Sequence, residues 1–152
     1  MALTTSRYGR EILMSDDWGS LRILEDREIT SDDHYTPEWC MKMFASYHDP
    51  CPPRSIRDAF SYDWCEHHDQ IFVNPPYSNP MPWVEKAIRE ISIYPDSTIV
   101  MLLKHDSSTR WYAKLVEAGA RFWMLQGRMN FTGPNQIKGA TASFPSVLVV
   151  LS

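Results

Sequence analysis

Asn74, Pro75, Pro76 and Tyr77 stand together after a short apolar run, and their residue types suit one kind of chemistry. Neither proline has an N–H group, and a residue before proline is held extended, so the segment is a stiff turn. The Asn74 side-chain oxygen and the Pro75 carbonyl are therefore two acceptors with little local donor competition. Two acceptors suit one –NH2 group. Accepting both of its hydrogens would turn the nitrogen lone pair toward an electrophile through positioning and electrostatics.

The tyrosine that follows could stack on the ring that carries such an amine, as aromatic side chains stack on bases. The alternative for Asn74 to Tyr77 is a structural one, a proline-rich turn with a capping asparagine and a packed tyrosine. Four-residue motifs recur by chance, so the segments around this one must decide between the two interpretations.

Apolar runs and helical spacing indicate the elements that position this turn. Strands are expected at residues 70–74, 98–103, 121–126 and 146–151, and helices from residue 37, from near residue 81 and from residues 106–107. Thr36, Asn79 and Asp106 or Ser107 are the expected helix caps. Alternating strands and helices predict a three-layer α/β domain, with a mainly parallel sheet and helices on both faces. Ligands bind beyond the carboxyl ends of such strands, which is where Asn74 lies.

Length and composition predict one folded domain. The chain has 152 residues, of which 43% are hydrophobic and 22% charged, as in ordinary globular proteins. We expect an N-terminal arm over residues 1–33, with at most short local structure, and a domain over residues 34–152. The sequence shows neither an apolar run long enough to span a bilayer nor a secretory signal, so a cytoplasmic protein without a membrane partner is expected.

The charge is unevenly distributed along the chain. The formal net charge is −4, which by itself argues against a nucleic-acid partner. Residues 1–75 hold 7 Lys/Arg and 14 Asp/Glu, a net of −7, whereas residues 76–152 hold 8 and 5, a net of +3. Such asymmetry suggests that the second half faces a polyanion, although a few surface charges could produce it by chance.

Asn74 to Tyr77 resemble the catalytic motif of amino-methyltransferases that use S-adenosylmethionine. The flanking segments narrow the resemblance to the phage-type, Dam-like DNA N6-adenine methyltransferases, and it covers about residues 33–151. The segments that carry it are Asp33-His34-Tyr35-Thr36-Pro37, Asp49-Pro50-Cys51, Leu102-Leu103, residues 106–112, Gln126-Gly127-Arg128-Met129-Asn130-Phe131 and Ser143-Phe144-Pro145-Ser146-Val147-Leu148-Val149. Several blocks in the expected order are far more specific than one tetrapeptide.

The resemblance implies a Rossmann-like class I methyltransferase fold, trimmed to minimal size, that transfers a methyl group from S-adenosylmethionine to N6 of an adenine flipped out of DNA. A paired and stacked base must leave the duplex for this reaction. The implied catalytic residues are Asn74, Pro75, Pro76 and Tyr77. The implied cofactor-binding residues are Tyr35, Thr36 and Pro37 at the methionine end, Asp49, Pro50 and Cys51 beneath it, and Phe72 beside the adenosyl group.

Asp63 is the candidate for the ribose hydroxyls, since a carboxylate at a strand end can accept both. Asp58, Glu66 and Asp69 compete for this role. The chain departs from ordinary cofactor-binding methyltransferases in lacking a Gly-rich turn over residues 48–53. No inserted recognition domain fits between the motifs, so any DNA sequence specificity must come from loops.

DNA contacts are expected in the net-positive half. Phosphate contacts position a protein without reading sequence, whereas amide side chains suit base edges. The expected DNA-binding residues are Lys104, Arg110, Lys114, Arg128, Asn135, Gln136 and Lys138. Solvated surface charges are the alternative explanation for each of them. DNA is the expected partner, the protein a monomer or homodimer, and its location the cytoplasm, or the host cytoplasm if a virus encodes it.

The cysteines and histidines do not predict a metal site, because Cys40, Cys51 and Cys65 lack the paired spacing of zinc ligands. Two other functions remain open. One is methylation of another planar amine or amide, such as cytosine N4, RNA adenine or a protein glutamine, which the same turn geometry would serve. The other is a non-catalytic binding protein on a degenerate methyltransferase fold.

Overall fold

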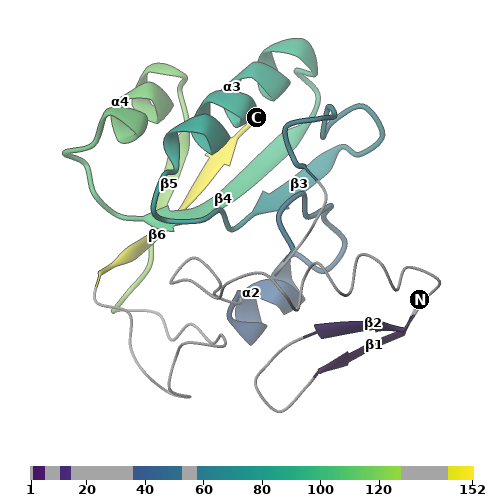
Figure 1. Cartoon of the computed structure of the whole chain (residues 1–152). Helices are drawn as coiled ribbons and strands as arrows, with labels where there is room; N and C mark the ends of the chain where they lie inside the picture. Colours follow the sequence, from purple (N-terminus) through teal and green to yellow (C-terminus); the bar gives the residue numbers. More distant parts are fainter. Residues whose placement is uncertain (1, 6–10, 15–35, 53–57, 128–143) are drawn as a thin grey trace.

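A computed structural model describes residues 2–5, 11–14, 36–52, 58–127 and 144–152 (Figure 1). The expected site residues Tyr35, Arg128, Asn135, Gln136 and Lys138 lie outside this part of the chain. The elements, in chain order, are β1 (Ala2–Thr5), β2 (Glu11–Met14), α2 (Glu38–Met43), β3 (Gln70–Val73), α3 (Met81–Ile93), β4 (Thr98–Lys104), α4 (Arg110–Glu117), β5 (Arg121–Met124) and β6 (Ser146–Leu151).

A four-stranded sheet in the order β3-β4-β6-β5 forms the centre of the molecule. β3 and β4 are parallel, whereas β6 is antiparallel to both of its neighbours, β4 and β5. The mixed α/β class is confirmed. The prediction of a mainly parallel sheet is wrong, because the strand pairing is mostly antiparallel. The reason is the position of β6: it runs against the other three strands and lies between two of them.

The two apolar faces of this sheet are covered by different helices, as the sequence predicts. Ile99, Met101 and Leu103 of β4 belong to one buried cluster, which also contains residues of α3 and α4. Val100 and Leu102 belong to a second cluster, which contains Cys40 of α2. Figure 1 shows α3 and α4 above the sheet and α2 below it. β4 is therefore buried on both faces, as its uninterrupted apolar sequence indicates.

The helix starts differ from the expected caps. α3 has Pro82 in its first turn as expected, but its N-cap is Pro80 rather than Asn79. The N-cap of α4 is Thr109, whose hydroxyl accepts the Tyr112 N–H, while Asp106 caps the preceding turn by accepting from Ser108 N. Several neighbouring Asp, Ser and Thr side chains can all cap, and the local turn decides which of them does.

Two further expectations concern helix ends. The N-cap of α2 is Pro37, so Thr36 is not its cap, and the Thr36 hydroxyl bonds elsewhere, as described below. α4 ends as predicted, because Gly119 follows it with φ of 76°, a conformation that glycine adopts without steric cost. None of the described helices is long and apolar enough to cross a membrane.

The described residues of the first 33 form a separate two-stranded antiparallel sheet. β1 and β2 pair with Ala2 opposite Met14 and Thr5 opposite Glu11. The position of a domain boundary at residue 33 stays a prediction.

Candidate active site

Asn74 directly follows β3 and lies at the carboxyl end of that strand. Ile71, Phe72 and Val73 are buried, and only 7% of Asn74 is exposed. Its amide Nδ2 donates to the Thr36 hydroxyl at 3.1 Å. This bond anchors the amide group, with the nitrogen toward Thr36. Asn74 is thus an ordered polar group at a strand end, followed by a stiff Pro-Pro turn.

Alternation along the strands places Asn74 on the α2 side of the sheet. Phe72 belongs to the buried cluster on that side and Val73 to the cluster on the other, so Asn74 returns to the side of Phe72. The bond to Thr36, two residues before α2, agrees with this placement. By the same alternation Lys104 follows Leu102 onto this side at the end of β4. Both strand ends therefore present their polar residues on the side of α2.

Phe144 contacts both Tyr77 and Lys104 at this end of the sheet. The rings of Tyr77 and Phe144 meet edge to face, with centroids 5.2 Å apart and planes at 77°. The Lys104 ammonium lies 5.6 Å from the centroid of the Phe144 ring, a favourable cation–π distance. Burial raises the pKa of Tyr77 above its usual range, so its hydroxyl stays protonated at neutral pH. Tyr77 thus offers a neutral aromatic group held by Phe144.

Asp49 lies at the same end of the sheet through an isolated pairing with β3. His48 and Ile71 form a parallel bridge, in which His48 N donates to Gln70 O and Phe72 N donates to His48 O, both at 2.9 Å. Because the bridge is parallel, both chains leave it in the same direction, and Asp49 is carried toward the Asn74 end. The carboxyl Oδ1 of Asp49 accepts the Cys51 N–H at 2.8 Å.

The Asp49 carboxyl is poised to titrate near neutral pH. Burial raises the pKa of Asp49 to about 6 from its ordinary value of 3.8, and the Cys51 N–H opposes part of this rise. Burial disfavours the ionised form, so a cation placed beside this group would favour its ionisation. Perturbed carboxyl groups of this kind occur most often at functional sites.

The other expected cofactor residues are distributed as follows. Pro37 and Pro50 are buried and flank α2 and the His48 bridge respectively. Phe72 is 5% exposed and its ring stacks on that of Phe44, with centroids 4.7 Å apart and planes at 9°. Thr36 and Cys51 are half-buried and contact Asn74 and Asp49, so the structure brings the first and second predicted segments to the Asn74 end.

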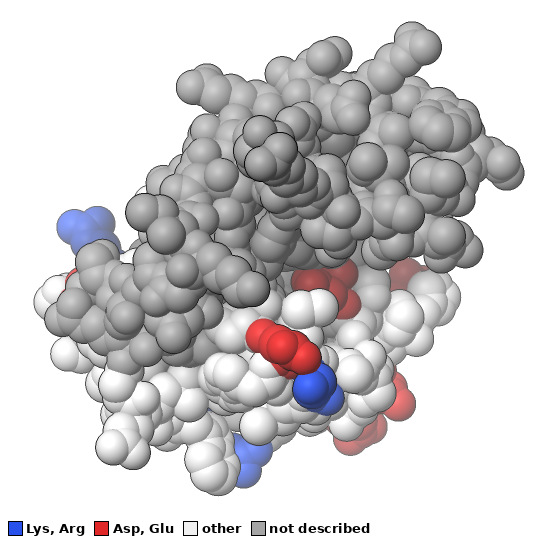
Figure 2. All heavy atoms as spheres, turned by 90° about the horizontal axis from the view of Figure 1, so that it is seen from below, with Lys and Arg blue, Asp and Glu red and all other residues white. Residues whose placement is uncertain are grey.

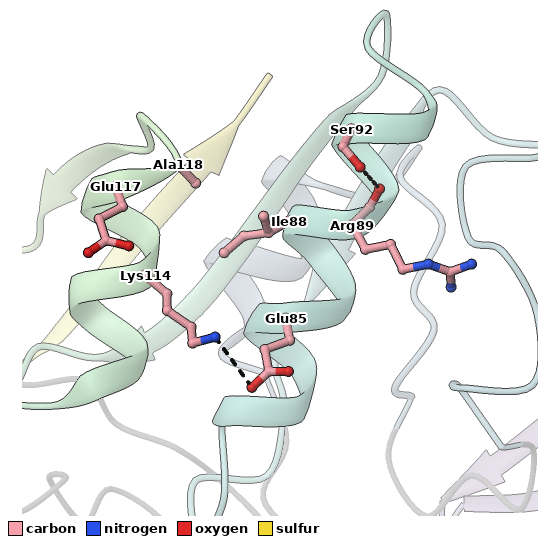
Figure 3. A pocket seen from close by; sticks show the side chains of 7 residues that line it. All are labelled: Glu85, Ile88, Arg89, Ser92, Lys114, Glu117 and Ala118. Carbon is pink, nitrogen blue, oxygen red and sulfur yellow. Dashed lines mark hydrogen bonds and ion pairs between the residues drawn. The ribbon is translucent and has the colours of Figure 1, made fainter.

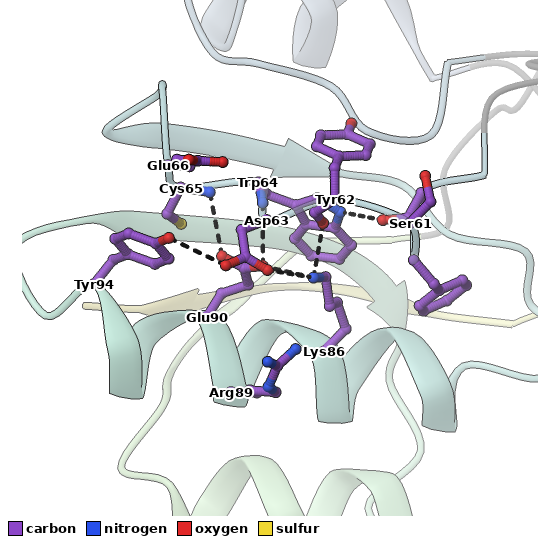
Figure 4. A network of polar contacts seen from close by, with 12 residues as sticks. Ser61, Tyr62, Asp63, Trp64, Cys65, Glu66, Lys86, Arg89, Glu90 and Tyr94 are labelled. Carbon is purple, nitrogen blue, oxygen red and sulfur yellow. Dashed lines mark hydrogen bonds and ion pairs between the residues drawn. The ribbon is translucent and has the colours of Figure 1, made fainter.

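Asp63, the candidate for the ribose hydroxyls, lies against α3 instead. Its Oδ2 accepts from the Tyr94 hydroxyl at 3.1 Å, and its Oδ1 is 3.5 Å from the Lys86 ammonium (Figure 4). Tyr94 follows the carboxyl end of α3, away from the end at which this helix leaves the Asn74 turn. Of its competitors, Asp58 accepts the Phe60 N–H at 2.8 Å, and Glu66 lies 3.8 Å from exposed His67. The ribose assignment stays a prediction.

The described DNA-binding candidates do not form one cluster. Lys104 borders Phe144, and exposed Arg110 begins α4. Lys114 instead lies 3.8 Å from Glu85, in an open hollow of about 480 Å³ between α3 and α4 (Figure 3). On the face seen in Figure 2, the described Lys and Arg side chains lie apart from one another and form no continuous basic patch.

Two structural features of the site were not anticipated from the sequence. Phe144 lies within a segment that carries the family resemblance, but no role was assigned to it. Lys86 and Glu90 form a buried ion pair, and their i,i+4 spacing on the inner face of α3 was the available signal. Among the described residues, no group of three or more His, Cys, Asp and Glu side chains could hold a metal ion.

Comparison with known proteins identifies the family. Residues 32–152 match the family described as DNA N-6-adenine-methyltransferase (Dam). The chain is similar to a protein named DNA N-6-adenine-methyltransferase from Haemophilus phage HP1 (strain HP1c1), with 41% identity over 56 residues, which cover 37% of this chain and 31% of the relative. The matched stretch thus spans about a third of that relative's length. No solved structure matches.

The family match covers most of the chain, including the Asn74 turn, the Asp49 segment and Lys104. It confirms the resemblance that the sequence motifs indicate. The chain therefore belongs to the DNA N-6-adenine-methyltransferase (Dam) family.

Proposed function

We propose that this protein transfers a methyl group from S-adenosylmethionine to the N6 amine of adenine in DNA. The observation that carries the proposal is Asn74, a residue only 7% exposed at the end of β3, whose amide group is anchored by its bond to Thr36. Membership of the Dam family supports adenine as the target.

The residues at this end of the sheet fit S-adenosylmethionine. The cofactor has a cationic ammonium group and a sulfonium, and Asp49 is a half-buried carboxyl group with a raised pKa, whose ionisation a neighbouring cation would favour. Asp49, Pro50, Pro37 and Thr36 would hold the methionine end, with Phe72 beside the adenosyl group. When bound, S-adenosylmethionine supplies an electrophilic methyl group.

The Asn74 side-chain oxygen and the Pro75 carbonyl accept the two amine hydrogens of the target base. This pairing turns the nitrogen lone pair out of the ring plane by positioning rather than by removing a proton first. The Tyr77 ring, held edge-on by Phe144, offers the face on which the base stacks. The base must be taken out of the duplex to reach these groups.

DNA binding is proposed to use Lys104, next to Phe144, and Arg110, at the start of α4. Lys104 is the last residue of β4 and Arg110 follows that strand, at the end of the sheet where Asn74 lies. Lys114, Arg128, Asn135, Gln136 and Lys138 remain proposed DNA contacts from the sequence. A monomer or homodimer acting on DNA in the cytoplasm, or in a host's cytoplasm, completes the proposal.

The test is incubation of the purified protein with duplex DNA and isotopically labelled S-adenosylmethionine, followed by nucleoside analysis. Label in N6-methyladenine is expected, and Asn74→Ala is expected to abolish it. Asn79→Ala is the matched control, because Asn79 is an exposed asparagine of the same loop, and this change is expected to leave activity intact. Label in cytosine, RNA or protein, or the absence of cofactor binding, would overturn the proposal.

A further inference from the structure

A buried ion pair holds the segment before β3 against α3. The Lys86 ammonium lies 2.7 Å from Glu90 Oε1, and the two side chains are 7% and 1% exposed. Glu90 also accepts the backbone N–H groups of Trp64 and Cys65, at 3.1 and 3.2 Å, one through each carboxylate oxygen (Figure 4). A carboxylate paired with an ammonium and two N–H donors is fully engaged, so this segment has a fixed place on the helix.

Tyr62 connects this fixed segment to His48, the residue before Asp49. Its backbone carbonyl accepts from the Lys86 ammonium at 2.8 Å. Its hydroxyl shares a hydrogen bond with His48 Nε2 at 3.0 Å, and the two rings lie edge to face at 6.0 Å. The ring of His48 also stacks on the ring of His68, with centroids 4.1 Å apart. Tyr62 is therefore tied to α3 at its backbone and to His48 at its side chain.

The segment around His48 pairs with β3. Among the described residues this pairing is a bridge with two backbone hydrogen bonds. Side-chain contacts, such as that of Tyr62, add to the resistance of the segment to local opening. Asp49 is the next residue, and its carboxyl group must meet the cofactor at a defined position. A side-chain hydrogen bond from an anchored residue restricts the movement of this segment.

We infer that Tyr62 is a positioning residue for S-adenosylmethionine, which acts through His48 to fix Asp49 at the cofactor site. The inference rests on the proposed function of Asp49. Tyr62 does not touch the reacting groups, so it controls how well the cofactor site is preformed and not the chemical step. A preformed site binds its ligand more tightly because less ordering accompanies binding.

The experiment is calorimetric titration of S-adenosylmethionine into the wild-type protein and into Tyr62→Phe, which keeps the ring and removes the hydroxyl. The dissociation constant is expected to rise about fivefold, the size of one net hydrogen bond. The melting temperature without ligand should fall by no more than a few degrees, about the effect of one hydrogen bond, and kcat at saturating cofactor should stay unchanged, whereas KM for the cofactor rises. Tyr47→Phe is the matched control. Tyr47 precedes His48, but its hydroxyl accepts a long hydrogen bond, of 3.5 Å, from the exposed Gln70 side chain.

A second set of variants separates the hydrogen bond from general packing. His48→Leu is expected to weaken binding as much as Tyr62→Phe, and the double variant no more than either alone, since both remove the same bond. His48→Gln, whose amide can still bond to the Tyr62 hydroxyl, is expected to retain most of the affinity. Wild-type affinity in Tyr62→Phe, or additive losses in the double variant, would overturn the inference. A wild-type protein that binds no cofactor would instead defeat the proposed function.

Discussion

Asn74 Nδ2 and Thr36 Oγ1 are 3.1 Å apart, although their residues are 38 positions apart in the chain. This bond joins the segment before α2 to the turn after β3. An asparagine amide can rotate by 180° at its end, which would exchange its oxygen for its nitrogen in the site. A hydroxyl can accept from the amide nitrogen or donate to the amide oxygen, and in the structure the Thr36 hydroxyl accepts from the nitrogen. Thr36 therefore anchors the Asn74 amide group at the end of β3.

Replacing Thr36 tests this role. Thr36→Val keeps the shape of the side chain and removes the hydroxyl, so we expect kcat for DNA methylation to fall about tenfold as the amide group loses this anchor. Thr36→Ser keeps the hydroxyl and should retain most of the activity. Steady-state assays at saturating cofactor and DNA measure both. Equal activity of the valine and serine variants would show that the bond does not orient Asn74.

The pKa of Asp49 predicts a pH dependence of stability with a definite sign. The folded protein holds this proton up to about pH 6, whereas the unfolded chain releases it near 3.8. The contribution to the free energy of unfolding is thus fully present below about pH 4 and is lost as the pH rises to about 6, a change of roughly 2–3 kcal/mol. Asp49→Asn should be more stable than wild type at pH 7.5 by that order, and equally stable at pH 3.5. Denaturant unfolding at the two pH values measures this.

Cofactor binding should show the opposite dependence on pH. The cationic cofactor favours the ionised carboxylate, so its affinity for the wild-type protein should fall as the pH drops through 6. In Asp49→Asn the affinity should be lower at pH 7.5 and nearly independent of pH between 5 and 7.5. Calorimetric titrations across this range distinguish the two proteins. A pH-dependent affinity in Asp49→Asn would assign the titration to another group.

The sequence predicts where the strands and helices lie better than how they pair. The uninterrupted apolar run in β4 places a strand buried on both faces, and the structure has one there. The amino-acid sequence of β6 does not indicate that this strand lies between β4 and β5 and is antiparallel to both. The direction of strand pairing depends on contacts between residues far apart in the chain. A parallel sheet was therefore an incorrect extrapolation from alternating strands and helices.

The site shows the same division. Asn74 and its prolines could be identified from local chemistry, and Asp49 from the family resemblance. The bond between Asn74 and Thr36 could not, since Thr36 also satisfied the local criteria for a helix cap. Lys86 and Glu90 have the spacing of an exposed helix pair, but in the structure they are buried and hydrogen-bonded to the backbone of residues 62–65, which a helical pattern cannot predict.

Lys86→Met should destabilise the protein strongly. It leaves the Glu90 carboxylate buried without its ammonium partner, and breaking a buried pair in this way costs about 3–5 kcal/mol. Chemical denaturation measures the loss. The chain offers a matched control in Lys42→Met, because Lys42 and Glu38 form an i,i+4 pair at 3.0 Å that is 75% and 82% exposed. This second change should leave stability unaltered. Similar losses in both variants would mean that burial of the Lys86 pair does not determine its contribution.

Lys104 and Arg110 should contribute more to DNA binding than Lys114. Phosphate contacts add affinity without sequence preference, and removing one lowers the salt dependence of binding by about one counterion. Lys104→Ala and Arg110→Ala are each expected to weaken binding to all duplexes alike and to flatten the plot of affinity against salt. Lys114→Ala should change both less, because its ammonium lies beside the Glu85 carboxylate, between α3 and α4. Fluorescence anisotropy with one duplex at several salt concentrations measures the slopes. A salt slope lowered only by Lys114→Ala would move the DNA-binding surface from the carboxyl end of β4 to the hollow between the two helices.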